Sequence, residues 1–180
     1  AFVHVGSDDA VTLFIHKAEM GQGTVTSLSM LLAEELECDW KKVRTEFPGV
    51  SREYGGMQGV FGSASVRTSF DSLRRAGAAA REMLVQAAAQ QWGVDPSQCH
   101  AENNAVVNTA TNARLSYGSV AEAASKLTAP ANPAMKDPAQ FRVIGKPLKR
   151  LDTPPKVDGS AGFGIDVRLP GMLYAVVSRC

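Results

Sequence analysis

The feature that most constrains the fold of this chain is a helical pattern that runs from about Ser65 to Gln91. One face of this segment carries apolar or small residues at alternating spacings of four and three: Val66, Phe70, Leu73, Gly77, Ala80, Leu84 and Ala87. That spacing is typical of a helix with one buried face. Its middle, residues 76–80, contains only alanine and glycine, and a glycine weakens an isolated helix by about 1 kcal/mol. We therefore expect this part of the helix to pack closely against a sheet or another helix.

Shorter patterns surround this helix. Apolar residues at spacings of three and four predict a second helix from about Thr24 to Glu37, with Thr24 or Thr26 as its cap. Other runs predict strands at Phe2–Val5, Val11–His16 and Val43–Phe47, a hairpin over Cys99–Val107 and a helix over Tyr117–Lys126. This mixture predicts an α+β fold, in which a mixed β-sheet is packed with two main helices.

Composition excludes several classes of protein. Hydrophobic residues make up 44% of the chain and charged residues 21%, as in ordinary globular domains. The net charge is +1 and lysine and arginine form no block, which argues against nucleic-acid binding. No apolar run approaches the roughly 18 residues of a membrane span. The three cysteines, Cys38, Cys99 and Cys180, are far apart and lack the spacing of a metal site or a disulfide framework.

The strongest local signal lies between a predicted strand and the helix that begins near Thr24, in Glu19-Met20-Gly21-Gln22-Gly23-Thr24. Glycines on both sides of Gln22 allow a ligand to approach the backbone, and the free amides of the next helix point at the loop. Such a loop suits a phosphate, and the amide of Gln22 can both donate to and accept from a heterocycle. The pattern alone leaves open a tight strand-to-helix turn without a ligand.

A second loop of the same kind precedes the long helix. The segment from Pro48 to Gly62 is rich in glycine and ends in Gly62-Ser63-Ala64-Ser65. Ser63 and Ser65 can cap the helix or offer hydroxyls to a phosphate, and Arg67 in the first turn can meet the same anion. A cap alone does not need four preceding glycines, here Gly55, Gly56, Gly59 and Gly62. Two such units predict an extended surface that binds an anion and a heterocycle.

Other polar residues give weaker signals. We expect Glu34 and Glu35 on a solvated helix face, and His4, His16 and His100 in strands or at the surface. Further arginines of the long helix, Arg74, Arg75 and Arg81, are expected to point to solvent or to pair with Asp71 and Glu82. No serine, histidine and aspartate pattern suggests a nucleophile, and the GxSxG and phosphate-loop signatures are absent.

The last third of the chain changes in composition. Residues 128–155 are rich in proline, lysine and polar residues, which predicts an extended connector across a surface. A second module begins near Lys156, with strands predicted at Ala161–Val167 and Met172–Ser178. Both ends of the sequence fall within strand-like runs, so we expect a piece of a longer polypeptide.

Three motifs together resemble segments of one known family. Glu19-Met20-Gly21-Gln22-Gly23, followed by the helix with residues 32–36, resembles a pterin-binding segment of the xanthine oxidase family of molybdenum hydroxylases. Residues 62–66 resemble another such segment, and residues 156–166 with 169–175 resemble the start of that family's α/β hammerhead domain. A pterin-binding segment placed before the hammerhead is similar to the order in the isoquinoline 1-oxidoreductase large (beta) subunit and its aldehyde dehydrogenase relatives. The resemblance implies a molybdopterin-binding segment over residues 1–127, a connector over 128–155 and an incomplete hammerhead over 156–180.

The resemblance implies a cofactor and the residues that bind it. The family uses a molybdopterin dinucleotide, in bacteria usually the cytosine form. The implied binding residues are Gly21, Gln22 and Gly23, through backbone and amide contacts, and Gly62, Ser63, Ala64 and Ser65, beside the pterin or its phosphates. The dithiolene of the pterin holds molybdenum, so no metal ligand is expected here. The family's catalytic glutamate lies beyond Cys180, so no catalytic residue is expected either.

The resemblance also implies an activity and partners. The family hydroxylates a carbon beside a ring nitrogen, or an aldehyde carbon, with water as the oxygen source, and electrons leave through a small subunit with 2Fe-2S clusters. Expected partners are the remainder of the large subunit, that iron–sulfur subunit and a small-molecule substrate, with a cytochrome c subunit as a further candidate. The resemblance favours a location in the bacterial periplasm or at a membrane, with the cytoplasm as an alternative location. The alternative is a non-catalytic fragment or scaffold domain that acts in assembly or partner binding. An unrelated nucleotide-binding domain is disfavoured, because the sequence lacks the phosphate-loop and Rossmann signatures of such domains.

Overall fold

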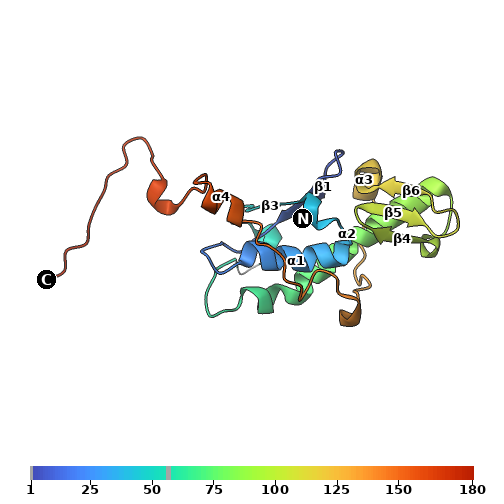
Figure 1. Cartoon of the computed structure of the whole chain (residues 1–180), viewed down its shortest axis with the longest axis horizontal. Coiled ribbons are helices and arrows are strands. Elements are labelled where there is room, and N and C mark those ends of the chain that lie inside the picture. Colours follow the sequence, from blue (N-terminus) through green and yellow to red (C-terminus); the bar gives the residue numbers. More distant parts are fainter. Residues whose placement is uncertain (1, 56–57) are drawn as a thin grey trace.

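Helix α2 (Ser65–Trp92) runs along the body of the molecule and organises it (Figure 1). The structure, a computed structural model, describes residues 2–55 and 58–180. Helix α1 (Thr24–Leu36) packs against α2. At Gly77 of α2, an added Cβ would lie only 2.5 Å from the carbonyl oxygen of Leu32. The close packing predicted from the small residues of this helix is therefore confirmed, because a larger side chain at Gly77 would push the helices apart.

The first sheet lies next to α1 and has the order β1-β2-β3. Its strands are β1 (Val3–Val5), β2 (Val11–Phe14) and β3 (Val43–Glu46). Strands β1 and β2 form an antiparallel hairpin, whereas β2 and β3 are parallel and are joined through α1, as a parallel connection requires. Alternate side chains of the second strand, Val11 and Leu13, are fully buried with Leu28, Leu32 and Leu36 of α1. This shared burial holds α1 against one face of the sheet.

A second, antiparallel sheet packs against α2. It contains β4 (Cys99–Glu102), β5 (Ala105–Asn108) and β6 (Arg114–Ser116) and leads into α3 (Tyr117–Ser125). The predicted hairpin is confirmed, and its turn residues Asn103 and Asn104 both have left-handed backbone conformations, as the twist of a two-residue hairpin loop demands. Buried Tyr117 donates its hydroxyl to the carbonyl of Leu36 at 2.6 Å. The predicted α+β class is thus confirmed, and the described residues form two small sheets.

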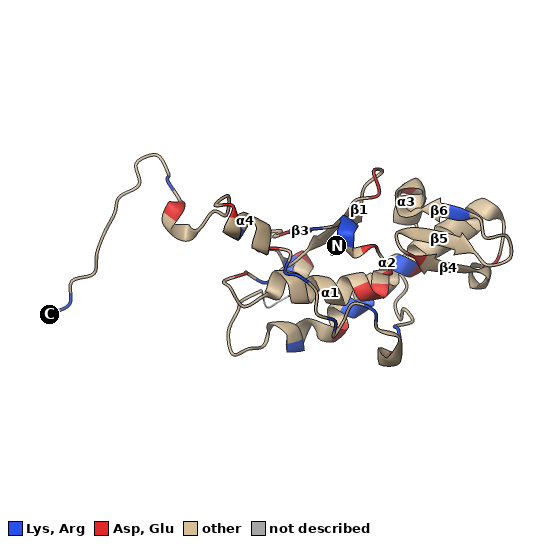
Figure 2. Cartoon of the chain, in the orientation of Figure 1, with Lys and Arg blue, Asp and Glu red and all other residues tan. Residues whose placement is uncertain are grey.

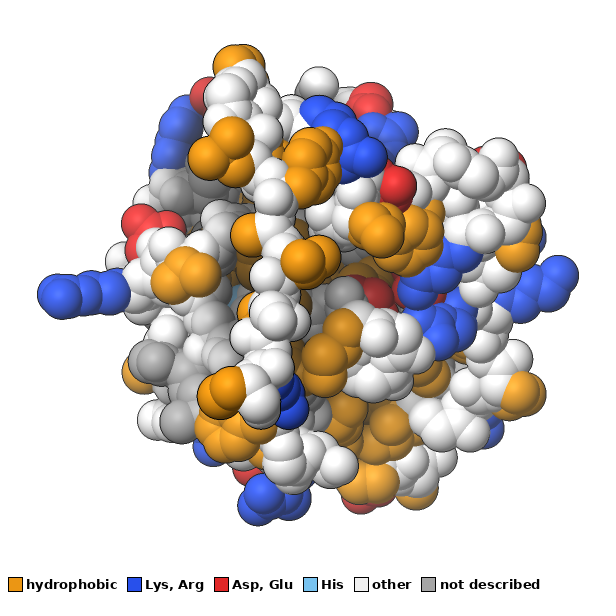
Figure 3. All heavy atoms as spheres, turned by 90° about the vertical axis from the view of Figure 1, so that its left-hand side faces the viewer, with side chains coloured by type: hydrophobic (Ala, Val, Ile, Leu, Met, Phe, Trp, Pro, Cys, Tyr) orange, Lys and Arg blue, Asp and Glu red, His pale blue; other side chains and the backbone are white. Residues whose placement is uncertain are grey.

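The segment after α3 runs back along α1 and then leaves the body as an exposed tail (Figure 1). It contains α4 (Thr153–Val157) and short 3-10 turns at Pro138–Gln140 and Gly164–Asp166, and the body has further 3-10 turns at Trp40–Lys42, Arg52–Tyr54 and Pro96–Gln98. The strands predicted in residues 161–167 and 172–178 were wrong for this structure, since neither segment pairs with another. Figure 3 looks onto this end, where the tail carries exposed apolar side chains such as Val176. A strand needs a neighbour for its backbone groups, and these segments have none within the described residues.

Two acidic side chains that we expected in solvent are buried instead. Glu34 and Glu35 are 1% and 0% exposed. Glu35 pairs with Arg74 at 2.7 Å and with Arg81 at 3.4 Å. The partners predicted for these two arginines were therefore wrong as well. In Figure 2 the acidic end of α1, coloured red, lies beside ribbon segments coloured blue for lysine and arginine.

Glu34 fastens the connector to α1. Its carboxylate accepts the backbone amides of Arg142, Val143 and Ile144 and pairs with Lys136 at 2.5 Å. Burial alone would raise the pKa of Glu34, but the hydrogen bonds from Lys136 and these amides outweigh it and lower the pKa. The connector is thus held on α1 through specific bonds to a buried carboxylate.

Candidate functional site

The first glycine loop, residues 17–23, joins β2 to α1. Gly21 and Gly23 have φ angles of 104° and 89°, which favour glycine, and nothing lies within 4 Å of an added Cβ at either position. Helix α1 begins after Gly23 without a side-chain cap. The predicted cap from Thr24 or Thr26 was therefore wrong.

The first glycine loop already holds an anion, which is its own Glu19. The carboxylate of Glu19 accepts the amides of Gly21, Gly23 and Val25 at 2.8, 2.9 and 3.0 Å. Burial opposes the charge, but these hydrogen bonds outweigh burial and lower the pKa of Glu19. The amides that we expected to face a phosphate are thus occupied. The sequence did not reveal this arrangement, because a glutamate two residues before a Gly-x-Gly turn does not show where its carboxylate points.

Gln22 also closes the first glycine loop. Its Oε1 accepts the amide of Met20 at 2.7 Å, and its Nε2 donates to the carbonyl of Ala18 at 2.9 Å. The side-chain amide therefore fixes the loop in this conformation, while the residue itself remains exposed. The contact of Gln22 with a heterocycle stays a prediction.

The end of the connector is bonded to the same loop. Arg150 donates to the carbonyl of Gly21 at 3.0 Å and pairs with Glu19 at 3.3 Å. Asp152 holds Arg150 at 2.7 Å, and Arg150 keeps the pKa of the Asp152 carboxyl well below its usual range. The amide of Leu151 donates to Thr26 Oγ1 at 3.0 Å. Residues 150–152, which the sequence did not single out, thus brace the first glycine loop.

The second glycine loop, residues 58–64, leads into α2. Two residues of the predicted motif, Gly56 and Met57, lie outside the described residues. Gly62 and Ser63 have left-handed φ angles of 58° and 51°. Helix α2 begins after Ala64 with no side-chain cap and no acidic residue in its first turn. The predicted capping by Ser63 or Ser65 was wrong, and no described side chain neutralises this helix end.

Both glycine loops line one cleft of about 480 Å³. Met20, Gln22, Thr24 and Ser27 form one side, and Val60, Phe61, Gly62, Ser63, Ser65 and Val66 form the other. Buried Lys17 helps to link the loops, since its Nζ donates to the carbonyl of Gly59 at 3.2 Å. The structure therefore brings Gln22 together with Gly62, Ser63 and Ser65. Gly23 and Ala64 flank the cleft along the chain.

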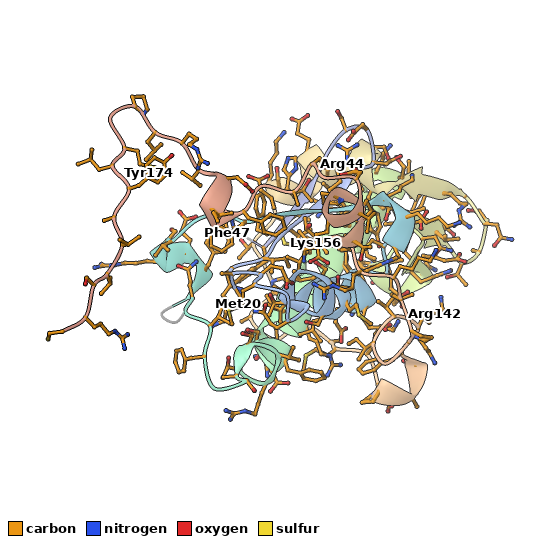
Figure 4. All side chains as sticks on the ribbon, turned by 60° about the vertical axis from the view of Figure 1, so that its left-hand side comes forward. Met20, Arg44, Phe47, Arg142, Lys156 and Tyr174 are labelled. Atoms are coloured by element: carbon orange, nitrogen blue, oxygen red, sulfur yellow. The ribbon has the colours of Figure 1, made fainter. Side chains whose placement is uncertain are left out.

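A larger cavity of about 1030 Å³ also borders the first glycine loop. Gly21 lines it, together with Met20, Phe47, Lys156 and Phe163. Figure 4 shows Met20, Phe47 and Lys156 at the end of the body from which the tail leaves. Gly21 thus faces this cavity, and the seven predicted site residues do not all converge on one point.

The cleft is suited to binding through neutral donors. The hydroxyls of Ser63 and Ser65 line it, whereas those of Thr24 and Ser27 already donate to the carbonyls of Ala18 and Gly23. The helix end beside it carries the partial positive charge of free amides. Arg67 is exposed in the first turn of α2, and its contact with a phosphate stays a prediction. No group of three metal-binding side chains occurs within residues 2–55 and 58–180.

His16 was expected in a strand or at the surface, but it is buried. Its Nδ1 has no hydrogen-bond partner among the described residues, and its ring lies against Phe2. Burial and the neighbouring charge of Lys17 lower its pKa. A neutral imidazole is the form that such a site accepts.

Comparison with known proteins decides the family. The sequence profile of the molybdopterin cofactor-binding domain matches residues 1–163. The chain belongs to this family. It is 34% identical to the beta subunit of isoquinoline 1-oxidoreductase from Brevundimonas diminuta, over 98% of the chain and 28% of that protein. It is 35% identical to the membrane-bound aldehyde dehydrogenase (pyrroloquinoline-quinone) of Gluconacetobacter polyoxogenes, over 94% of the chain and 22% of that protein.

A further relative and two solved structures agree. A nicotinate dehydrogenase subunit of Pseudomonas putida is 30% identical over 99% of the chain and 15% of its own length. Quinoline 2-oxidoreductase from Pseudomonas putida 86 has a TM-score of 0.54 at 21% identity, over 77% of the chain and 19% of that structure. CO dehydrogenase from Oligotropha carboxidovorans has a TM-score of 0.55 at 16% identity, over 67% of the chain and 15% of that structure. These structures share the fold.

The resemblance to the molybdenum hydroxylase family is thus confirmed, and the chain is a molybdopterin cofactor-binding domain. It spans 15 to 28% of the lengths of the three relatives named above. No helix of the described residues is long and apolar enough to cross a membrane.

Proposed function

We propose that the chain is the N-terminal, cofactor-binding portion of a molybdenum hydroxylase large subunit, with molybdopterin cytosine dinucleotide bound in the cleft between the two glycine loops. The observation that carries this proposal is the shared cleft, which joins two loops that are far apart in the sequence. The residues fit the cofactor. Glycines leave open space where side chains would project, and the α2 end offers donors without a described competing carboxylate.

The two loops have different tasks in this proposal. At the start of α2, the residues Gly62, Ser63, Ala64 and Ser65 bind a phosphate of the dinucleotide through backbone amides and hydroxyls, where the helix dipole favours an anion. Gln22 faces a neutral heterocyclic part of the cofactor, and Gly21 and Gly23 leave open space on either side of it. Glu19 supports this division, because its carboxylate occupies the amides at the start of α1 and would repel a phosphate there.

The bound cofactor supplies the two-electron chemistry that hydroxylates an N-heterocycle or oxidises an aldehyde, with water as the oxygen donor. The names of the relatives, which include isoquinoline, aldehyde and nicotinate, support these substrate classes. The residues of this chain bind and orient the cofactor, whereas the catalytic base lies in other parts of the large polypeptide. We propose segment boundaries at 1–127, 128–155 and 156–180, the last as the start of a hammerhead domain, and an iron–sulfur subunit as the electron acceptor.

The proposal is tested by Gly62→Leu in the assembled enzyme, with Gly93→Leu as the matched control. Both glycines have a left-handed φ, of 58° and 66°, and both have open space around an added Cβ, but Gly93 ends α2 far along the chain from the cleft. We expect Gly62→Leu to lower molybdenum and cytidine content about tenfold, the equivalent of roughly 1.4 kcal/mol. Gly93→Leu should leave both contents near the wild-type level. Equal losses in the two variants, or full content in both, would refute the assignment of the cleft.

A further inference from the structure

Strand β1 presents an open edge. The amide of Phe14 donates to the carbonyl of Phe2, and the amide of Gly6 donates to the carbonyl of Ala10. Residues of an antiparallel strand alternate between facing the partner and facing away. With Val3 opposite Leu13 and Val5 opposite Val11, the backbone groups of Val3 and Val5 therefore point away from β2. No hydrogen bond to a described residue engages them.

An apolar groove follows this edge, between β1, α2 and α3. We call it the edge groove, and it has a volume of about 480 Å³. Its floor consists of small side chains of the two helices, including Ala76, Ala79 and Ala80 of α2 and Ala121 and Ala124 of α3. No Asp, Glu, Lys or Arg lines the groove. In Figure 1, β1 lies on the side of the first sheet that faces α3. The small side chains leave room for the side chains of an added strand.

The opposite edge of the same sheet differs. Strand β3 carries Arg44 and Glu46, which are both exposed. Charged residues on an edge strand discourage pairing with another chain. Strand β1 has no such protection, since its residues are Val3, His4 and Val5. The two edges are thus built for different neighbours, water for β3 and a polypeptide backbone for β1.

We propose that an extended, uncharged segment of the same large subunit, from outside residues 1–180, adds a fourth strand to β1 and fills the edge groove. Strand addition uses free backbone groups for affinity and apolar pockets for alternate side chains, and β1 with its groove offers both. The chain spans at most 28% of its relatives named above, so such a subunit has ample further sequence. The apolar lining favours a permanent partner within one subunit over a transient one. This inference rests on the proposal that the chain is part of a large subunit, but it does not depend on the cofactor.

Residue-resolved hydrogen exchange on the assembled large subunit tests this proposal. We expect the amides of Val3 and Val5 to exchange at least about 100-fold more slowly than free amides, as in a paired strand. Exchange at the rate of free amides would overturn the proposal. Protection that disappears on dilution, together with a dimer in solution, would also overturn it, because the neighbour would then be a second copy.

A proline scan gives an independent check. Val5→Pro removes an amide that points away from β2, which an edge strand tolerates and a paired strand does not. Thr45→Pro is the control on the other edge: Glu46 accepts the amide of Ile15 through its carbonyl, so the preceding amide of Thr45 faces outward. We expect Val5→Pro to speed exchange at Val3 about tenfold or more, as local opening becomes easier, and Thr45→Pro to leave it unchanged. If neither variant changes exchange at Val3, β1 has no added strand. If Val5→Pro fails to fold, the wild-type measurement still decides.

Discussion

The two glycine loops both place glycines shortly before a helix, but their electrostatic states are opposite. In the first glycine loop, Glu19 accepts three amides at the start of α1, and Arg150 braces it from outside. In the second glycine loop, α2 begins without an acidic residue or a side-chain cap. Gly-x-Gly before a helix is therefore not sufficient evidence for a phosphate site. The position of the nearest carboxylate decides whether the helix end is available.

The comparison predicts that a carboxylate placed in the second loop will act as Glu19 does in the first. Ala64→Asp puts a negative charge at the start of α2, where the helix dipole should stabilise the cofactor-free chain by about 0.3–1 kcal/mol. The same charge should repel a phosphate and lower molybdenum and cytidine content in the assembled enzyme about tenfold or more, or roughly 1.4 kcal/mol. Chemical denaturation and cofactor analysis measure the two effects.

Ala110→Asp is the control for this substitution. Ala110 is exposed in a turn of the second sheet, so the variant makes the same change in net charge far along the chain from either loop. It should change the free energy of unfolding by no more than about 0.5 kcal/mol, and it should leave the cofactor content unchanged. A gain in stability with unchanged cofactor content in Ala64→Asp would place the phosphate elsewhere.

Removal of the charge in the first loop should have a smaller effect, and one that depends on pH. Glu19→Gln keeps the shape of the side chain but weakens its bonds to three amides, which should cost about 1 kcal/mol near neutral pH. The folded-state pKa of Glu19 lies below its ordinary value of 4.5. Its contribution is therefore fully present above that value and is lost as the pH falls through the folded-state pKa.

Denaturation curves of wild type and Glu19→Gln between pH 7 and pH 2 measure this contribution. The difference in free energy of unfolding between them should shrink on acidification, because the wild-type carboxyl becomes neutral as well. Glu46→Gln is the control, since Glu46 is exposed on β3, and its difference from wild type should stay near zero over the same pH range. A difference that stays constant with pH would mean that the charge of Glu19 does not stabilise the loop.

Local patterns predicted the elements that position the site. The spacing of apolar residues located α1 and α2, and the small residues around Gly77 predicted their close contact, because each of these signals lies within a few helical turns. The glycines of both loops were equally visible. The structure adds that Gln22, Ser63 and Ser65 face one cleft, which no single motif contains.

The errors have a common physical origin in distant partners. Glu34 and Glu35 look like solvated residues until the connector supplies Lys136 and the amide of Val143, about a hundred positions later in the sequence. The role of Glu19 was missed although its partners are near, because a glutamate beside glycines does not reveal that its carboxylate turns back. The strands predicted near the C-terminal end were wrong because a sequence pattern indicates which face of a segment is apolar. It does not say which neighbour covers that face.

The smallest predicted effect concerns the brace on the first loop. Arg150→Ala removes the bonds to Gly21 and Glu19 but leaves the three amide bonds of Glu19 intact. We therefore expect a few-fold faster hydrogen exchange in residues 21–25 and a few-fold faster loss of cofactor, within the range of local opening, with little change in overall stability. Arg142→Ala is the matched control, because Arg142 lies on the same connector and is largely exposed, at 3.9 Å from Glu37. Equal exchange rates in the two variants would show that the loop keeps its shape without Arg150. The two glycine loops would then differ through one carboxylate and not through the connector as well.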